Sequence, residues 1–83
     1  MIVYTDYPII ELGDIPYQEA PIRECIILSY DNDKYCNVYF PHESKKIITE
    51  IKLGYLYTKP VRAGTPFTIS SKEVHSFISN LLY

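Results

Sequence analysis

The alternation of apolar and polar residues over residues 23–40 predicts a β-hairpin. Two apolar runs in this stretch flank the polar residues 31–34. We expect Asn32 and Asp33 to form the turn between the two strands, because these residue types tolerate the positive φ angles of tight hairpin turns. A four-residue loop closed by Tyr30 and Tyr35 would give the same register.

The register of this hairpin sorts its side chains onto two faces, since successive residues of a strand point to opposite sides of the sheet. Asp31 then opposes Lys34, and Ile27 opposes Val38. One face is apolar enough to form a core and consists of Cys25, Ile27, Ser29, Cys36, Val38 and Phe40. The other face is mixed and consists of Glu24, Ile26, Leu28, Tyr30, Tyr35, Asn37 and Tyr39. We expect the second face to be half-buried or to contact a partner.

The same register keeps the two cysteines apart. Cys25 and Cys36 lie four residues from each other along the ladder, which corresponds to about 13 Å at the rise of a strand. A disulfide needs Cα atoms within about 7 Å. We therefore expect two free, buried thiols, as in a reducing compartment, and no metal pair.

Alternation elsewhere predicts a long strand over residues 46–58, with Gly54 at a bend or bulge. Shorter strands are expected at residues 2–5, 8–12 and 67–69. Together with the hairpin they would form an antiparallel, curved sheet of four to five strands. An SH3-like or OB-like barrel is the variant in which the bend at Gly54 closes the sheet.

The C-terminal segment has the pattern of a helix. Residues 70–73 read Ser-Ser-Lys-Glu, which matches a capping box. Apolar residues follow at helical spacing and form one stripe: Val74, Phe77, Ile78, Leu81 and Leu82. We expect this helix to dock on the sheet and residues 1–83 to form a single α+β domain.

The size and composition of the chain set limits on this picture. With 83 residues, 47% of them hydrophobic, it can build one packed core and not two. It shows neither a basic and apolar leader segment nor an apolar run of about 18 residues, so we expect a soluble, cytoplasmic protein. Because a small core leaves little net stability, a homodimer is one of the possible states of the protein.

Motifs for catalysis or metal binding are incomplete. The three glycines form no phosphate loop. The two cysteines lack zinc-type spacing with His42 and His75. Residues 31–33 read Asp-Asn-Asp, but a calcium loop would need a glutamate at its twelfth position, where His42 stands. We expect no enzymatic activity, no metal and no cofactor.

A basic region over residues 45–62 is the alternative basis for function. Its cationic side chains are those of Lys45, Lys46, Lys52, Lys59 and Arg62. Together with Tyr55 and Tyr57 they could hold a single-stranded nucleic acid, because such sites combine basic grooves with stacking aromatics. The sequence pI of about 5.5 opposes this, as does the expected placement of Lys52 on the face opposite the two tyrosines.

The abundance of tyrosine favours protein binding instead. The chain has nine tyrosines and no tryptophan, and tyrosine is enriched at protein interfaces. The main hypothesis is a small non-enzymatic protein-binding module, such as an inhibitor or adaptor by which a phage or mobile element acts on a host protein. The predicted partner-binding residues are Tyr30, Tyr35, Tyr39, Asp31 and Asp33. A small-ligand pocket between helix and sheet is a third hypothesis.

Overall fold

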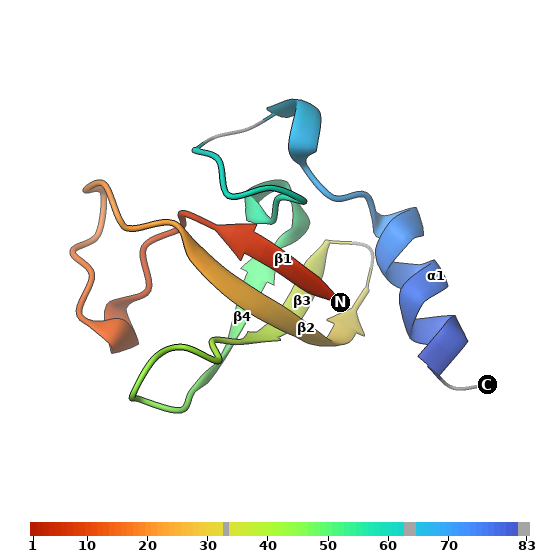
Figure 1. Cartoon of the computed structure of the whole chain (residues 1–83), viewed down its shortest axis with the longest axis horizontal. Helices are drawn as coiled ribbons and strands as arrows, with labels where there is room; N and C mark the ends of the chain where they lie inside the picture. The colour runs from red at the N-terminus through yellow and green to blue at the C-terminus, as the bar shows by residue number, and fades with distance from the viewer. Residues whose placement is uncertain (33, 63–64, 82–83) are drawn as a thin grey trace.

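The computed structural model describes residues 1–32, 34–62 and 65–81. In this part of the chain an antiparallel, curved sheet of four strands is joined by one C-terminal helix, which confirms the α+β prediction (Figure 1). The elements in chain order are β1 (Ile2–Thr5), the 3₁₀ turn η1 (Ile10–Leu12), β2 (Arg23–Asp31), β3 (Tyr35–Tyr39), β4 (Ile48–Lys52), the 3₁₀ turns η2 (Leu53–Tyr55) and η3 (Thr65–Phe67), and α1 (Ser71–Leu81). The strands follow each other in the sheet in the order β1-β2-β3-β4.

The strand predicted over residues 46–58 is shorter than expected. β4 ends at Lys52, and the chain then turns through η2, which contains Gly54. After this turn Tyr57 pairs with Tyr4 of β1: the Tyr4 N–H donates to the Tyr57 carbonyl at 2.8 Å, and the Tyr57 N–H donates to the Tyr4 carbonyl at 2.7 Å. The bend therefore carries the chain from the last strand to the free edge of the first, although β1 and β4 do not pair with each other and the sheet stays open.

Two other predicted strands are replaced by 3₁₀ turns. Residues 8–12 contain η1, which ends at Gly13 in a left-handed conformation with φ of 95°, and the Gly13 N–H bonds to the Ile10 carbonyl at 2.9 Å. Residues 67–69 contribute only one bridge, between Thr68 and Tyr57. At residues 8–12 the turn closes its backbone hydrogen bonds locally. At residues 67–69 the bonds go to the segment after η2: the Thr58 N–H donates to the Phe67 carbonyl at 2.8 Å, and the Ile69 N–H donates to the Leu56 carbonyl at 2.9 Å.

The hairpin has the predicted register at its base and a different one near its turn. Ile27 opposes Val38 as expected, but the register shifts between Ile27 and Ser29, which leaves Leu28 as the extra residue of a β-bulge. Beyond the bulge the pairs are Ser29 with Asn37, Tyr30 with Cys36 and Asp31 with Tyr35. Because directly opposed side chains share a face, Tyr30 moves to the core side and Ser29 to the outer side, the reverse of the prediction.

The turn of the hairpin differs in length from both the two-residue and the four-residue loop that were predicted. Asp31 pairs with Tyr35, so the connection spans residues 32–34. Asn32 has a φ of 72°, and its side-chain oxygen accepts the Lys34 N–H at 3.0 Å, which closes an Asx turn. Asp33, predicted as the second turn residue, lies outside the described residues.

The core lies inside the curved sheet and is closed by the segments around it. Its buried members are Val3, Ile9, Cys25, Ile27, Cys36, Val38, Phe40, Ile51, Leu53, Leu56, Ile69 and Val74. Most of the residues predicted for the core face of the hairpin are among them. Leu56, by contrast, was expected on a solvated face and is fully buried, because η2 changes the phase of the alternation.

Helix α1 starts as the capping box predicts. The Glu73 N–H donates to Ser70 Oγ at 3.2 Å, and the Ser70 hydroxyl donates to Glu73 Oε1 at 3.1 Å. Val74 is fully buried and Ile78 packs against the core, so the helix docks beside the end of β2 (Figure 1). Leu82, predicted for the same stripe, lies outside the described residues. No helix in the described part of the chain combines the length and apolar character that crossing a membrane requires.

Candidate functional site

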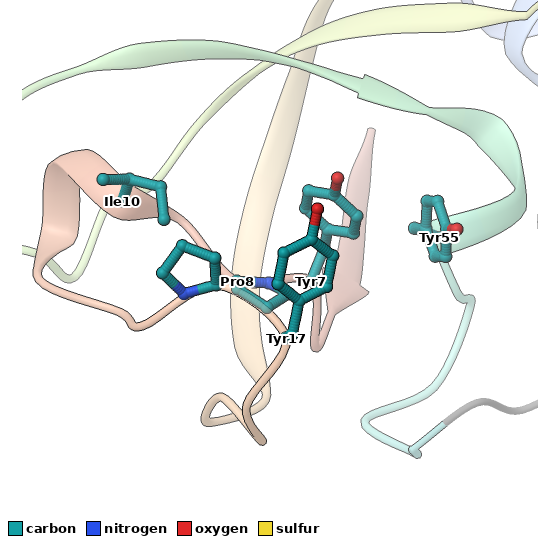
Figure 2. A pocket seen from close by; sticks show the side chains of 6 residues that line it. Tyr7, Pro8, Ile10, Tyr17 and Tyr55 are labelled. Carbon is teal, nitrogen blue, oxygen red and sulfur yellow. The ribbon is translucent and has the colours of Figure 1, made fainter.

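An aromatic hollow of about 380 Å³ opens between the loop after β1 and the turn η2. It is lined by Tyr7, Pro8, Ile10, Pro16, Tyr17 and Tyr55. Figure 2 shows Tyr7, Pro8, Ile10 and Tyr17 arriving from the loop, with Tyr55 on the other side. Three rings and two prolines thus form an open, weakly polar surface.

A single buried hydroxyl ties the two sides of this hollow together. Thr5, at the end of β1, donates its Oγ1–H to the Tyr55 carbonyl at 2.6 Å and accepts the Tyr7 N–H at 3.2 Å. The rings of Tyr7 and Tyr55 are then in contact, with centroids 4.7 Å apart and planes inclined by 44°. Such tilted aromatic pairs are favourable, so the two tyrosines form a preorganised unit.

A cluster of charged side chains anchors the loop after β1, which carries most of the residues that line the aromatic hollow. The terminal nitrogens Nη1 and Nη2 of Arg23 donate to the two carboxylate oxygens of Asp14, at 2.5 and 2.9 Å. Arg23 Nε donates to Glu43 Oε1 at 2.9 Å. Asp14 also accepts the Ile9 N–H at 2.7 Å. The hydrogen bonds from Arg23 lower the pKa of the Asp14 carboxyl, and Asp14 in turn raises the pKa of Arg23. The loop is therefore anchored to the start of β2.

A second hollow of about 160 Å³ adjoins the first. It is lined by Tyr7, Tyr35, Glu50, Ile51, Lys52 and Tyr55. The two hollows meet at Tyr7 and Tyr55, and we call the combined surface the aromatic groove; its rings are those of Tyr7, Tyr17, Tyr35 and Tyr55.

The end of the aromatic groove formed by β4 is acidic. Glu50 is fully exposed, and its pKa is raised by a hydrogen bond and repulsion from Asp31. Lys52 places its ammonium 6.0 Å from the centroid of the Tyr35 ring. Two carboxylates that repel each other disfavour a bound phosphate at this end.

The structure disperses the residues predicted to bind a partner. Tyr35 and Asp31 lie at the acidic end of the groove. Tyr39 lies on the outer face of the sheet, whereas Tyr30 packs against the core with its ring 6.4 Å from that of His75. Asp33 lies outside the described residues. Tyr35 and Tyr39 share the outer face of the sheet as predicted, whereas the prediction was wrong for Tyr30, which the bulge at Leu28 moves to the core side.

Sequence reasoning missed two rings of the groove, Tyr7 and Tyr17, and named Tyr55 only for the alternative nucleic-acid site. A local signal was available for Tyr7, which directly precedes Pro8 on the loop. Proline restricts the backbone of the residue that precedes it, so Tyr7 is held in few conformations. Tyr17 follows Pro16 and is not restricted in this way. For Tyr55 a bend at Gly54 was expected, but the strand was expected to continue beyond it, so a turn that carries Tyr55 to the loop was not foreseen.

The basic side chains of the alternative site make separate contacts. Lys46 lies over the Tyr39 ring at 5.8 Å, and Lys59 lies over the Phe67 ring at 4.9 Å. Arg62 pairs with Glu19 at 2.9 Å and donates to the Ala20 carbonyl at 2.6 Å.

The two cysteines are free and buried, as predicted. Burial raises the pKa of Cys25 to about 12 and that of Cys36 to about 11. His42 is exposed and hydrogen-bonds to the carboxylate of Glu24. In the part of the chain that the structure describes, histidine, cysteine and acidic side chains form no group of three or more that could hold a metal ion.

These thiols are expected to react very slowly while the protein is folded. With a pKa of about 11, Cys36 is ionised in about one molecule in a thousand at pH 8, and only the thiolate is nucleophilic. Labelling with a disulfide reagent at pH 8 should therefore be at least about a hundredfold slower in native protein than in denaturing urea. A Ser29→Cys variant, with a thiol on an exposed residue, is the matched control and should label rapidly. Rapid native labelling of the unmodified protein would show that the cysteines are accessible.

The aromatic groove is the concave surface on which the loop, η2 and β4 converge, and it is the candidate site. It combines the tilted Tyr7–Tyr55 pair with two further tyrosines and two prolines. Comparisons of the chain with protein-family models, with curated proteins and with solved structures found no match.

Proposed function

We propose that the protein is a small non-enzymatic binding module that holds a short, extended, proline-containing segment of a partner protein in the aromatic groove. The observation that carries this proposal is the contact between the rings of Tyr7 and Tyr55, which are partly exposed to solvent. The Thr5 hydroxyl holds the two residues in place by hydrogen bonds to the Tyr7 N–H and the Tyr55 carbonyl. A rigid pair loses little conformational entropy on binding.

The shape of the groove fits an extended peptide better than a compact ligand. Its two hollows lie one after the other and share the Tyr7–Tyr55 pair between them. A polyproline II segment has three residues per turn of about 9 Å and no internal hydrogen bonds. Its side chains can enter successive hollows between rings, while its free carbonyls accept hydrogen bonds from tyrosine hydroxyls.

The charges around the groove favour a protein over a nucleic acid. Asp31 and Glu50 place negative charge at one end, where a phosphate backbone would be repelled. Of the basic side chains, Arg62 is paired with Glu19. The class of function is the one predicted from the sequence, an inhibitor or adaptor, but its surface is different, since only Tyr35 of the three predicted tyrosines borders the groove.

Binding to an array of synthetic proline-rich decapeptides, with scrambled and proline-free controls, tests the proposal. We expect a subset of the proline-rich peptides to bind and Tyr55→Ala to weaken that binding at least tenfold, because it removes the ring shared by both hollows. Tyr39→Ala is the matched control: it removes a tyrosine from the outer face of the same sheet and should leave affinity unchanged.

Three outcomes would contradict the proposal. The first is the absence of binding to any of the peptides. The second is binding that Tyr39→Ala weakens and Tyr55→Ala does not, which would return the site to the outer face. The third is tight, steeply salt-dependent binding to single-stranded oligonucleotides together with no peptide binding, which would support the basic region over residues 45–62.

A further inference from the structure

The outer face of the sheet carries an apolar row that crosses all four strands. Strand pairing aligns Ile2 with Ile26, Ile26 with Tyr39, and Tyr39 with Ile48. Directly paired residues point their side chains to the same face, so these four side chains lie side by side. Ile2 is 58% exposed and Ile48 is 64% exposed, and Leu28 at the bulge is 50% exposed.

Such a row is unusual on a small domain. Solvent-facing strand positions are ordinarily polar, and contiguous apolar surface marks an interaction site. The other side of this sheet is already covered by the loop, η2 and α1, so the row is the outer surface of the domain and not an unfilled part of its core.

Two opposite charges flank the row at the end formed by β4. Lys46 lies on one side, with its ammonium over the Tyr39 ring, and Glu50 lies on the other side, two residues beyond Ile48. Glu50 faces repulsion from Asp31 within its own chain. Glu24, an acidic residue on the same face, is already paired with His42.

This arrangement is complementary to itself. When two copies face each other across a two-fold axis that runs along the row, each apolar side chain meets its own equivalent. The rotation also exchanges the two sides of the row, so Lys46 of one copy comes opposite Glu50 of the other, and the contact forms twice. Two such sheets pack about 10 Å apart with aligned strands.

We infer that the outer face of the sheet is a homodimer interface, in which the row of Ile2, Ile26, Tyr39 and Ile48 packs against the same row of a second copy and Lys46 pairs with Glu50 of that copy. A dimer of this kind presents two aromatic grooves and so raises avidity for a partner with repeated segments. The inference is independent of what the grooves bind.

Charge reversal tests the pairing. We expect the wild-type protein to show a concentration-dependent monomer–dimer equilibrium in sedimentation velocity. Lys46→Glu and Glu50→Lys should each weaken the dimer by about tenfold or more, because each replaces both attractive pairs by repulsive ones. An equimolar mixture of the two variants should form a heterodimer, and the double variant should recover the homodimer. Lys72→Glu, on exposed α1, is the matched control and should have no effect.

Another variant, Ile2→Ser, distinguishes face-to-face packing from pairing along the free edge of β4. Ile2 lies on β1, three strands away from that edge, so Ile2→Ser should weaken only a face-to-face dimer. The exposed Ile10, on η1, supplies the control Ile10→Ser, which should leave the dimer intact. A monomer at all concentrations, a mixture that stays monomeric, or a dimer insensitive to Ile2→Ser would each overturn the inference. Peptide binding by Lys46→Glu and Ile2→Ser reports separately on the groove, because neither residue lines it, whereas Glu50 does.

Discussion

Asp14→Ala is expected to lower the free energy of unfolding by about 2–3 kcal/mol, because it leaves the nearly buried guanidinium of Arg23 with one partner in place of two. The side chains of Asp14 and Arg23 are only 9% and 11% exposed, so water cannot fully replace the lost hydrogen bonds. The substitution also releases the Ile9 N–H. Urea denaturation measures the change, and Glu11→Ala, which removes an exposed acid from the same loop, should change stability by less than about 0.5 kcal/mol.

The effect of Asp14 has a defined pH dependence. Its pKa is lowered in the folded protein by the hydrogen bonds from Arg23. A carboxyl with a lowered pKa contributes stability above its unfolded pKa, about 3.9, and loses that contribution as the pH falls through the folded value. The stability difference between wild type and Asp14→Asn should therefore be constant near neutral pH and shrink below about pH 4. A difference that grows on acidification would show that Arg23 does not control this carboxyl.

The Asp14 cluster also links stability to the proposed site. It anchors the loop on which Tyr7 and Tyr17 lie, while Thr5 fixes Tyr7 and Tyr55 from the other side. A folded Asp14 variant is therefore expected to bind peptide more weakly than wild type although none of its groove side chains has changed.

Leu56→Ala is expected to lower the free energy of unfolding by about 3 kcal/mol, the typical cost of truncating a fully buried leucine. Leu56 follows η2 and is held in the core by hydrogen bonds at both its N–H and its carbonyl, to Leu53 and Ile69. Simple alternation along residues 46–58 places the same side chain in solvent, where truncation would cost almost nothing. Chemical denaturation distinguishes the two cases directly.

Leu28→Ala provides the comparison for this prediction. Leu28 is half exposed at the bulge, so the same truncation should cost less than about 1 kcal/mol. Equal costs at Leu28 and Leu56 would mean that η2 does not place Leu56 in the core. If Leu56→Ala fails to fold, Leu56→Val keeps most of the side-chain volume and should lower stability by about 1 kcal/mol.

Local patterns in the sequence were sufficient where neighbouring residues alone decide the structure. The capping box at Ser70 and Glu73 sets the start of α1, because its hydrogen bonds close within a single turn. The base of the hairpin, with Ile27 opposite Val38, follows from the apolar alternation on both strands. The same register kept Cys25 and Cys36 from bridging, and both are free.

Errors arose where one extra residue or one tight turn changes the phase of a pattern. The bulge at Leu28 moves Tyr30 to the core side of the sheet, and η2 buries Leu56. Neither has a strong local signature, since Leu28 is a good strand residue and Gly54 permits several kinds of bend. Each was decided by packing, because the shifted phase brings Tyr30 and Leu56 into contact with the core.

The sequence by itself determined the α+β fold, with a hairpin, a capped C-terminal helix and two unbridged thiols, since those features depend on short-range pattern and geometry. Only the tertiary structure decided where the candidate site lies. Tyr7 and Tyr55 are 48 residues apart in the chain, and they meet because η2 returns the chain to the edge of β1, where the Thr5 hydroxyl bonds to both segments. Contacts of such long sequence separation depend on the packing of the whole domain, which no local pattern encodes.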